Sequence, residues 1–138
     1  MRRAFTIIEL LIVMAVIAIL VGIAIPSFRA MQIEAWRAKA QGDLRVLKLG
    51  TETYYKNHGF FPATGGPALM SALLGETNPV VESAISDPFA AANTPYAYSL
   101  SGSYYAIWSL GPNNNGAVTI VGNSAEATSG AIYVTNGR

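Results

Sequence analysis

An apolar run from Phe5 to Ile25 follows two arginines and carries one charged residue, Glu9. As an α-helix, a run of this length spans about 30 Å, the hydrocarbon thickness of a bilayer. Arg2 and Arg3 predict a cytoplasmic N-terminus, because cytoplasmic flanks of membrane helices are enriched in Lys and Arg. A charge inside such a segment costs about 2.5–3.5 kcal/mol on insertion scales and usually has a partner. The run therefore predicts one membrane-spanning helix with a functional acidic residue.

The carboxylate of Glu9 also has a local explanation. Thr6 and Glu9 have the spacing of a capping box, in which each side chain accepts a hydrogen bond from the backbone N–H of the other residue. The helix dipole favours a carboxylate in the first turn as well. A plain membrane anchor or a cleaved secretory signal would each fit such a segment. A signal is disfavoured, because its apolar core is usually about 7–15 residues long and ends at a small-residue cleavage site.

The sequence Arg-Arg-Ala-Phe-Thr-Ile-Ile-Glu-Leu at residues 2–10 resembles the class III signal of type IV pilins and type II secretion pseudopilins. The resemblance implies cleavage by prepilin peptidase between Ala4, where the family usually has Gly, and Phe5. It also implies N-methylation of Phe5 and an assembly role for Phe5 and Glu9. The amine of one subunit would pair with the carboxylate of a neighbour, which offsets two burial costs.

The helix is expected to continue to Asn57. Apolar and small residues recur there at three- and four-residue steps, which predicts an amphipathic half that carries a head: Ile33, Trp36, Ala40, Leu44, Leu47, Thr51 and Tyr54. Pro26 lacks the N–H that a helix would donate to the carbonyl of Gly22, so these two residues predict a kink at the membrane boundary. The family resemblance implies a segment that can unwind in a filament.

The remaining residues predict a small head with a short helix over 67–74 and a β-hairpin of 96–100 with 104–110. Further strands are expected over 117–121 and 131–135, all antiparallel because the connections are too short for helical crossovers. Four aromatics are expected to pack against the long helix: Tyr96, Tyr98, Tyr105 and Trp108. The predicted fold class is α+β, with a long N-terminal α-helix packed on a small antiparallel β-sheet head, like a type IV pilin. The predicted parts are a leader 1–4, a membrane or filament-core half 5–26, an amphipathic half 27–57 and a globular head 58–138.

Charge and cysteine content disfavour several functions. Residues 29–56 contain six Lys/Arg and three acids, whereas residues 57–137 contain four acids and no Lys or Arg, so a basic stalk precedes a weakly acidic head. A net charge of +1 gives no reason to expect a nucleic-acid partner. The chain has no cysteine for a disulfide, a zinc–thiolate site or a nucleophile. His58, expected on a surface turn, has no nucleophile partner in the sequence. An anchored enzyme or ligand-binding module is therefore disfavoured, and we expect a protein that is not an enzyme.

The head extends the resemblance toward the major pseudopilin through three segments: residues 53–62, 87–98 and 105–113. Such pseudopilins hold calcium in the loop that follows Ser-Leu-Gly. The matching loop here, 111–116, contains no acid, and Asp87 and Glu126 are the nearest acids in the sequence. Calcium prefers charged oxygen ligands. We therefore expect no cofactor and no metal ligand, with weak calcium binding as the alternative.

The resemblance implies a structural subunit of a type II secretion pseudopilus, a helical homo-oligomer that assembles from the inner membrane into the periplasm to drive protein export. Its implied partners are the lipid bilayer before assembly, minor pseudopilins, prepilin peptidase, an inner-membrane platform protein and an assembly ATPase. The alternative is a type IV pilin of a surface fibre for adhesion, motility or DNA uptake. Many such pilins have two C-terminal cysteines, which this chain lacks.

Overall fold

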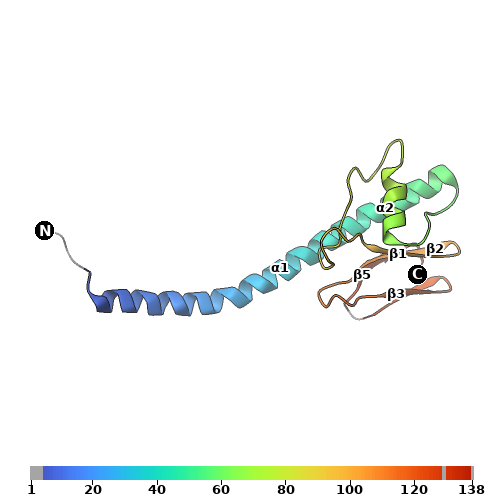
Figure 1. Ribbon diagram of the computed structural model, residues 1–138. Coiled ribbons are helices and arrows are strands. Elements are labelled where there is room, and N and C mark those ends of the chain that lie inside the picture. Colours follow the sequence, from blue (N-terminus) through green and yellow to red (C-terminus); the bar gives the residue numbers. More distant parts are fainter. Residues whose placement is uncertain (1–4, 129, 138) are drawn as a thin grey trace. The chain divides into compact units, whose positions relative to one another are not determined.

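The computed structural model describes residues 5–128 and 130–137. The chain divides into two compact units, Met1–Ala35 and Trp36–Arg138. The long helix α1 (Ile7–His58) contributes its N-terminal part to the first unit and the rest to the second. The architecture is the predicted α+β fold, a long N-terminal helix with a small antiparallel head (Figure 1). The predicted boundaries at 26 and 57 are not tested by this division and stay a prediction.

The first unit is a helix whose apolar side chains are exposed. An 18-residue window of α1 near the N-terminus has a mean hydropathy of 3.0, and none of it is buried. Phe5 is 82% exposed, and Leu11, Leu20 and Phe28 are also well exposed. By length and composition this helix can cross a membrane, and its exposed surface requires an apolar environment outside the chain.

The second unit is built around a three-stranded antiparallel sheet in the order β1-β2-β5. Its strands are β1 (Ala97–Ser101), β2 (Tyr104–Ser109) and β5 (Ile132–Thr135). Helix α1 and the short helix α2 (Gly66–Leu74) cover one face of the sheet (Figure 1). The hairpin of β3 (Val118–Val121) and β4 (Ser124–Ala127) lies on the other face, where Val118 and Ala106 are buried.

The predicted apolar face of α1 packs on the head within the second unit. Ala40, Leu44, Leu47 and Thr51 are 0% exposed, and Tyr54 packs against this core. Trp36 remains 38% exposed and meets the Phe89 ring edge-on, with the ring centroids 5.8 Å apart. The periodicity therefore identified the buried face of α1 correctly in this unit.

The prediction that Trp108 packs against α1 is wrong. Successive side chains of a strand point to opposite faces, so Tyr105 and Trp108, three residues apart, cannot share one. The register pairs Ile107 with Tyr98 on the α1 side, whereas Trp108 pairs with Tyr133 on the opposite face. Tyr96, Tyr98 and Tyr105 belong to the buried core, as predicted.

Strand β4 was not predicted from the sequence. Its residues, Ser-Ala-Glu-Ala, have weak strand propensity and only one large side chain. The strand forms because Gly122, with a φ of 64°, allows a tight turn that returns the chain along β3. Backbone pairing with β3 here outweighs the weak strand propensity of these residues.

Candidate functional site

The N-terminal end of α1 has the geometry of a capping box. The backbone N–H of Thr6 donates to Oε2 of Glu9 at 2.9 Å, and the Thr6 hydroxyl donates to the same oxygen at 2.7 Å. The backbone N–H of Glu9 donates in return to Oγ1 of Thr6 at 3.4 Å. The predicted capping box is thereby confirmed, and it explains why the helix begins at Ile7.

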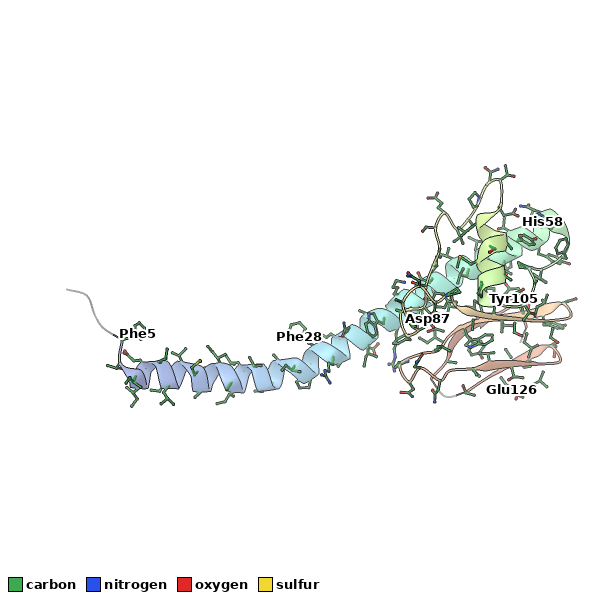
Figure 2. The ribbon with its side chains drawn as sticks, viewed as in Figure 1. Phe5, Phe28, His58, Asp87, Tyr105 and Glu126 are labelled. Atoms are coloured by element: carbon green, nitrogen blue, oxygen red, sulfur yellow. The ribbon has the colours of Figure 1, made fainter. Side chains whose placement is uncertain are left out.

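Phe5 lies directly before this cap, at the start of the described residues (Figure 2). Ala4, the other side of the predicted cleavage site, lies outside the described residues. An amine created at Phe5 would be one residue away from the Thr6 cap that holds Glu9. Cleavage between Ala4 and Phe5, methylation of Phe5 and the assembly role of both Phe5 and Glu9 stay predictions.

Gly22 and Pro26 lie in the helical part of the first unit, and α1 is assigned as helix through both residues. The Gly22 carbonyl is the one that Pro26, having no N–H, cannot bond in the i to i−4 pattern. A Cβ added at Gly22 would meet no atom within 4 Å. The arrangement weakens one turn of the helix, and the proposed kink or unwinding at these residues stays a prediction.

Polar side chains of α1 attach the head to the helix within the second unit. The hydroxyl of Tyr96 donates to Asp43 at 2.9 Å, and that of Tyr105 donates to Glu52 at 3.2 Å. Lys48 Nζ donates to the backbone carbonyl of Thr135 at 3.0 Å. These contacts were not predicted from the sequence, although a signal is present: Asp43 and Glu52 interrupt the basic stalk nine residues apart.

The three core tyrosines are held in their neutral form. Burial raises the pKa of Tyr98 to about 12, and its hydroxyl donates to the carbonyl of Pro62 at 3.1 Å. Burial also raises the pKa of Tyr96, reinforced by its hydrogen bond to Asp43. For Tyr105, burial and then the negative charge of Glu52 raise the pKa. Neutral phenols are therefore part of the folded core.

A second polar centre forms around Asp87, which is 4% exposed. Its Oδ1 accepts hydrogen bonds from the Ser109 hydroxyl at 2.7 Å and from the Phe89 N–H at 3.0 Å. Its Oδ2 accepts the Leu110 N–H at 2.8 Å. One buried carboxylate thus joins the loop before β1 to the end of β2 and to the start of the 111–116 loop.

The 111–116 loop is closed by its own backbone. The N–H of Gly116 donates to the carbonyl of Leu110 at 2.8 Å, and the N–H of Asn114 donates to the carbonyl of Gly111 at 2.9 Å. Gly111 has a φ of 71°, and a Cβ there would collide with the carbonyl oxygen of Gly130. Only glycine fits that position without strain.

The structure does not bring Asp87 and Glu126 together, and the expected absence of a metal ion stays a prediction. Protein donors engage both oxygens of Asp87, and Glu126 lies apart from it on β4 (Figure 2). In the described part of the chain, no group of three His, Cys, Asp or Glu side chains is placed to hold a metal.

His58 is the last residue of α1, rather than part of the turn that follows. Its ring stacks on Tyr54 with the centroids 4.2 Å apart, and Nδ1 lies 3.1 Å from the Tyr54 carbonyl. Nε2 lies 3.6 Å from Glu76. These contacts connect the end of α1 to the segment that follows α2, which is a structural role.

Comparison with known proteins identifies the N-terminal segment. Residues 1–25 match the family model described as the prokaryotic N-terminal methylation motif. The chain is 32% identical over 84 residues to the type IV major pilin protein PilE of Neisseria gonorrhoeae. The matched region covers 55% of this chain and 47% of PilE. It is 39% identical over 54 residues to the type IV major pilin protein PilA of Myxococcus xanthus, covering 39% of this chain and 24% of PilA.

A fimbrial protein of Neisseria meningitidis serogroup B is 32% identical over 84 residues, 55% of this chain and 46% of that protein. The chain thus spans less than half the length of the curated relatives it matches. No solved structure matches it at a significant level.

A membrane-length helix that starts at a methylation motif and continues into an α+β head has the fold of a type IV pilin. The chain is similar to type IV major pilin proteins over about half of its length, and residues 1–25 match the N-terminal methylation motif.

Proposed function

We propose that this protein is the subunit of a helical filament that grows from the inner membrane, and that the filament is a type II secretion pseudopilus. The observation that carries the proposal is the methylation motif at the start of a helix whose apolar N-terminal segment has no buried residue. Such a helix needs lipid around it or the equivalent helices of other copies. In the proposed assembly, the helix leaves the lipid and packs against the helices of other copies in a filament.

In this proposal prepilin peptidase cuts between Ala4 and Phe5, and the new amine of Phe5 is methylated. The cut removes Arg2 and Arg3 and leaves one amine four residues before Glu9. The amine pairs with Glu9 of a neighbouring subunit, because both groups are costly to leave unpaired in an apolar interior. A carboxylate has about four acceptor positions, so capping and pairing are compatible.

The proposed cellular course follows from the same segment. The subunit first spans the inner membrane with a cytoplasmic N-terminus, consistent with Arg2 and Arg3. It then enters a periplasmic filament with the help of a platform protein, an assembly ATPase and minor pseudopilins. Gly22 and Pro26 give the helix a turn that can kink or unwind during this transfer. Neither a cofactor nor an enzymatic activity is part of the proposal.

The proposal also distinguishes a type II secretion pseudopilin from a type IV pilin of a surface fibre. The head segments at 87–98 and 105–113 favour a pseudopilin. The relatives named as type IV major pilins favour the alternative, a surface fibre for adhesion, motility or DNA uptake. Cell fractionation at native expression separates the two. We expect fibres that stay in the periplasm, whereas long fibres sheared from the cell surface would favour the pilin.

The mature N-terminus tests the filament proposal most directly. Mass spectrometry of the membrane fraction should find a chain that begins with methylated Phe5. An intact Met1, or a chain cut beyond Pro26, would contradict both processing and filament formation.

Variants at the cap separate the two roles of Glu9. Glu9→Gln keeps a capping side chain but removes the charge, whereas Thr6→Ala weakens the cap and keeps the charge. Because pairing needs the charge, we expect Glu9→Gln and Glu9→Ala to insert normally but to lose most filament yield. Thr6→Ala should lose much less. Equal yields of Glu9→Gln and the unchanged protein would refute the pairing role.

A further inference from the structure

The exposed side of α1 carries a second set of residues with helical spacing, which extends from the side opposite the sheet to Arg45, beside β5. We call it the outer α1 face, and all of its members are exposed: Ala38, Gly42, Arg45, Val46 and Leu49. Leu49 is 56% exposed and Val46 is 39% exposed. A Cβ added at Gly42 would meet no atom within 4 Å, so a partner can approach the backbone there. Residues three and four apart share a helix face, so this set forms one exposed surface of α1, with Arg45 at its edge.

The β3–β4 hairpin presents a smaller surface of the same kind. We call it the outer hairpin face: Thr119, Val121 and Glu126. The register pairs Thr119 with Glu126 and Val121 with Ser124, so these side chains share the face that points away from the sheet. Val121 is 52% exposed, whereas Val118 on the inward face is 6% exposed. The face combines one apolar side chain with one carboxylate.

The two faces are complementary in charge. Residues 57–137 contain no Lys or Arg, whereas the outer α1 face carries Arg45. The second unit contains ion pairs between Lys39 and Asp43, Lys48 and Glu52, and His58 and Glu76. Neither Arg45 nor Glu126 takes part in any of these pairs. Each of the two charges therefore has no counter-charge among the described residues.

The two faces are also complementary in spacing. Arg45 and Leu49 lie one helical turn apart, a rise of about 6 Å. Val121 and Glu126 are diagonal neighbours across a two-stranded ribbon, about 7–8 Å apart. Long side chains absorb a difference of this size. An apolar contact of Leu49 with Val121 and an ion pair of Arg45 with Glu126 can therefore form together.

We propose that the outer α1 face of one copy binds the outer hairpin face of a second copy. Val46 and Leu49 cover Val121, and Arg45 pairs with Glu126. This proposal rests on the proposed filament function and specifies which faces of the heads meet. The two faces lie on opposite sides of the sheet (Figure 1), so the contact is head-to-tail and repeats from copy to copy. Heterologous contacts of this type build helical filaments.

Disulfide trapping tests the contact cleanly, because the native chain contains no cysteine. Leu49→Cys and Val121→Cys in one chain should give a ladder of covalent multimers when filaments are oxidised. Within one copy the two positions lie on opposite sides of the sheet and cannot bond to each other. Leu49→Cys with Val80→Cys is the matched control, because Val80 is another half-exposed head residue, 37% exposed. The control pair should give no ladder.

Charge exchange gives a second readout. Arg45→Glu and Glu126→Arg should each lower filament yield at least five-fold, and the double exchange should restore at least half of it. Glu82→Arg changes an exposed acid outside the hairpin and should leave the yield unchanged. Filaments that assemble normally but give no ladder, or an Arg45→Glu variant with full yield, would overturn this contact and leave the filament function standing. An unmodified chain that forms no filament would overturn both proposals.

Discussion

The carboxylate of Asp87 should contribute more to stability than any other acid of the head. It is buried and accepts three hydrogen bonds, two of them from backbone N–H groups. Hydrogen bonds to a charged acceptor contribute about 1.5–3 kcal/mol each. Asp87→Asn keeps the shape but replaces one oxygen by an NH₂ group, which must then face a donor. Losing one such bond and weakening the other two should cost about 2–4 kcal/mol.

The melting temperature reports this loss. For a unit of about one hundred residues, 1 kcal/mol corresponds to about 4–8 °C, so Asp87→Asn should lower the melting temperature by about 8–32 °C. The assay is near-UV circular dichroism of the full chain in detergent micelles, which follows the tyrosines of the core. Glu126→Gln is the matched control, because it neutralises an exposed carboxylate and should change stability by less than about 0.5 kcal/mol.

The contact with Ser109 provides an internal check. Ser109→Ala alone should cost about 1 kcal/mol, because Asp87 keeps its two backbone donors. The double variant Asp87→Asn/Ser109→Ala should lose less stability than the sum of the two single losses, since both single variants remove the same 2.7 Å hydrogen bond. A melting temperature of Asp87→Asn within about 3 °C of the unchanged protein would refute the assigned role of this carboxylate.

Three further outcomes are expected. Tyr98 has a folded-state pKa of about 12, against an ordinary value of 10.0. The stabilisation by its neutral phenol is therefore complete below pH 10 and is lost as the pH rises toward 12, by up to about 1.4 kcal/mol per pH unit. Tyr98→Phe should reduce that decline in the free energy of unfolding, measured by urea titrations between about pH 9 and 11.5. Gly111→Ala should cost more than about 2 kcal/mol, because its Cβ meets the Gly130 carbonyl, whereas Gly102→Ala, with open space around it, should cost about 1 kcal/mol. Calcium or a chelator should leave the melting temperature unchanged, and a rise of several degrees with calcium would show that the 111–116 loop holds an ion.

The sequence predicted most of α1 and of the sheet because both have strong local signals. The capping residues Thr6 and Glu9, the steps from Ala40 to Thr51 and the aromatic hairpin around Gly102 are all local patterns. The structure confirms each of them. Trp108 lies on the other face because it is an odd number of residues from Tyr105 and Ile107 in β2.

The polar contacts of the head could not be predicted in the same way. Asp87 and Ser109 are separated by 22 residues, and Tyr105 and Glu52 by 53. No local spacing encodes such a pair, and a carboxylate near a turn has the same sequence pattern whether it binds an ion or accepts backbone N–H groups. For Asp87 the structure shows three protein donors at its two oxygens.

The boundary between the two units bears on how a subunit of this kind could change environment. Within the second unit, Trp36, Lys39, Asp43 and the buried core residues of α1 contact the head. The N-terminal unit contributes no residue to that core. A capping box contributes only about 1 kcal/mol, so the exposed apolar helix depends on lipid or on other helices for its stability. Under the proposed function, assembly replaces one apolar environment by another around residues 7–35. The hydrogen bonds that hold the head to α1 stay intact during this exchange.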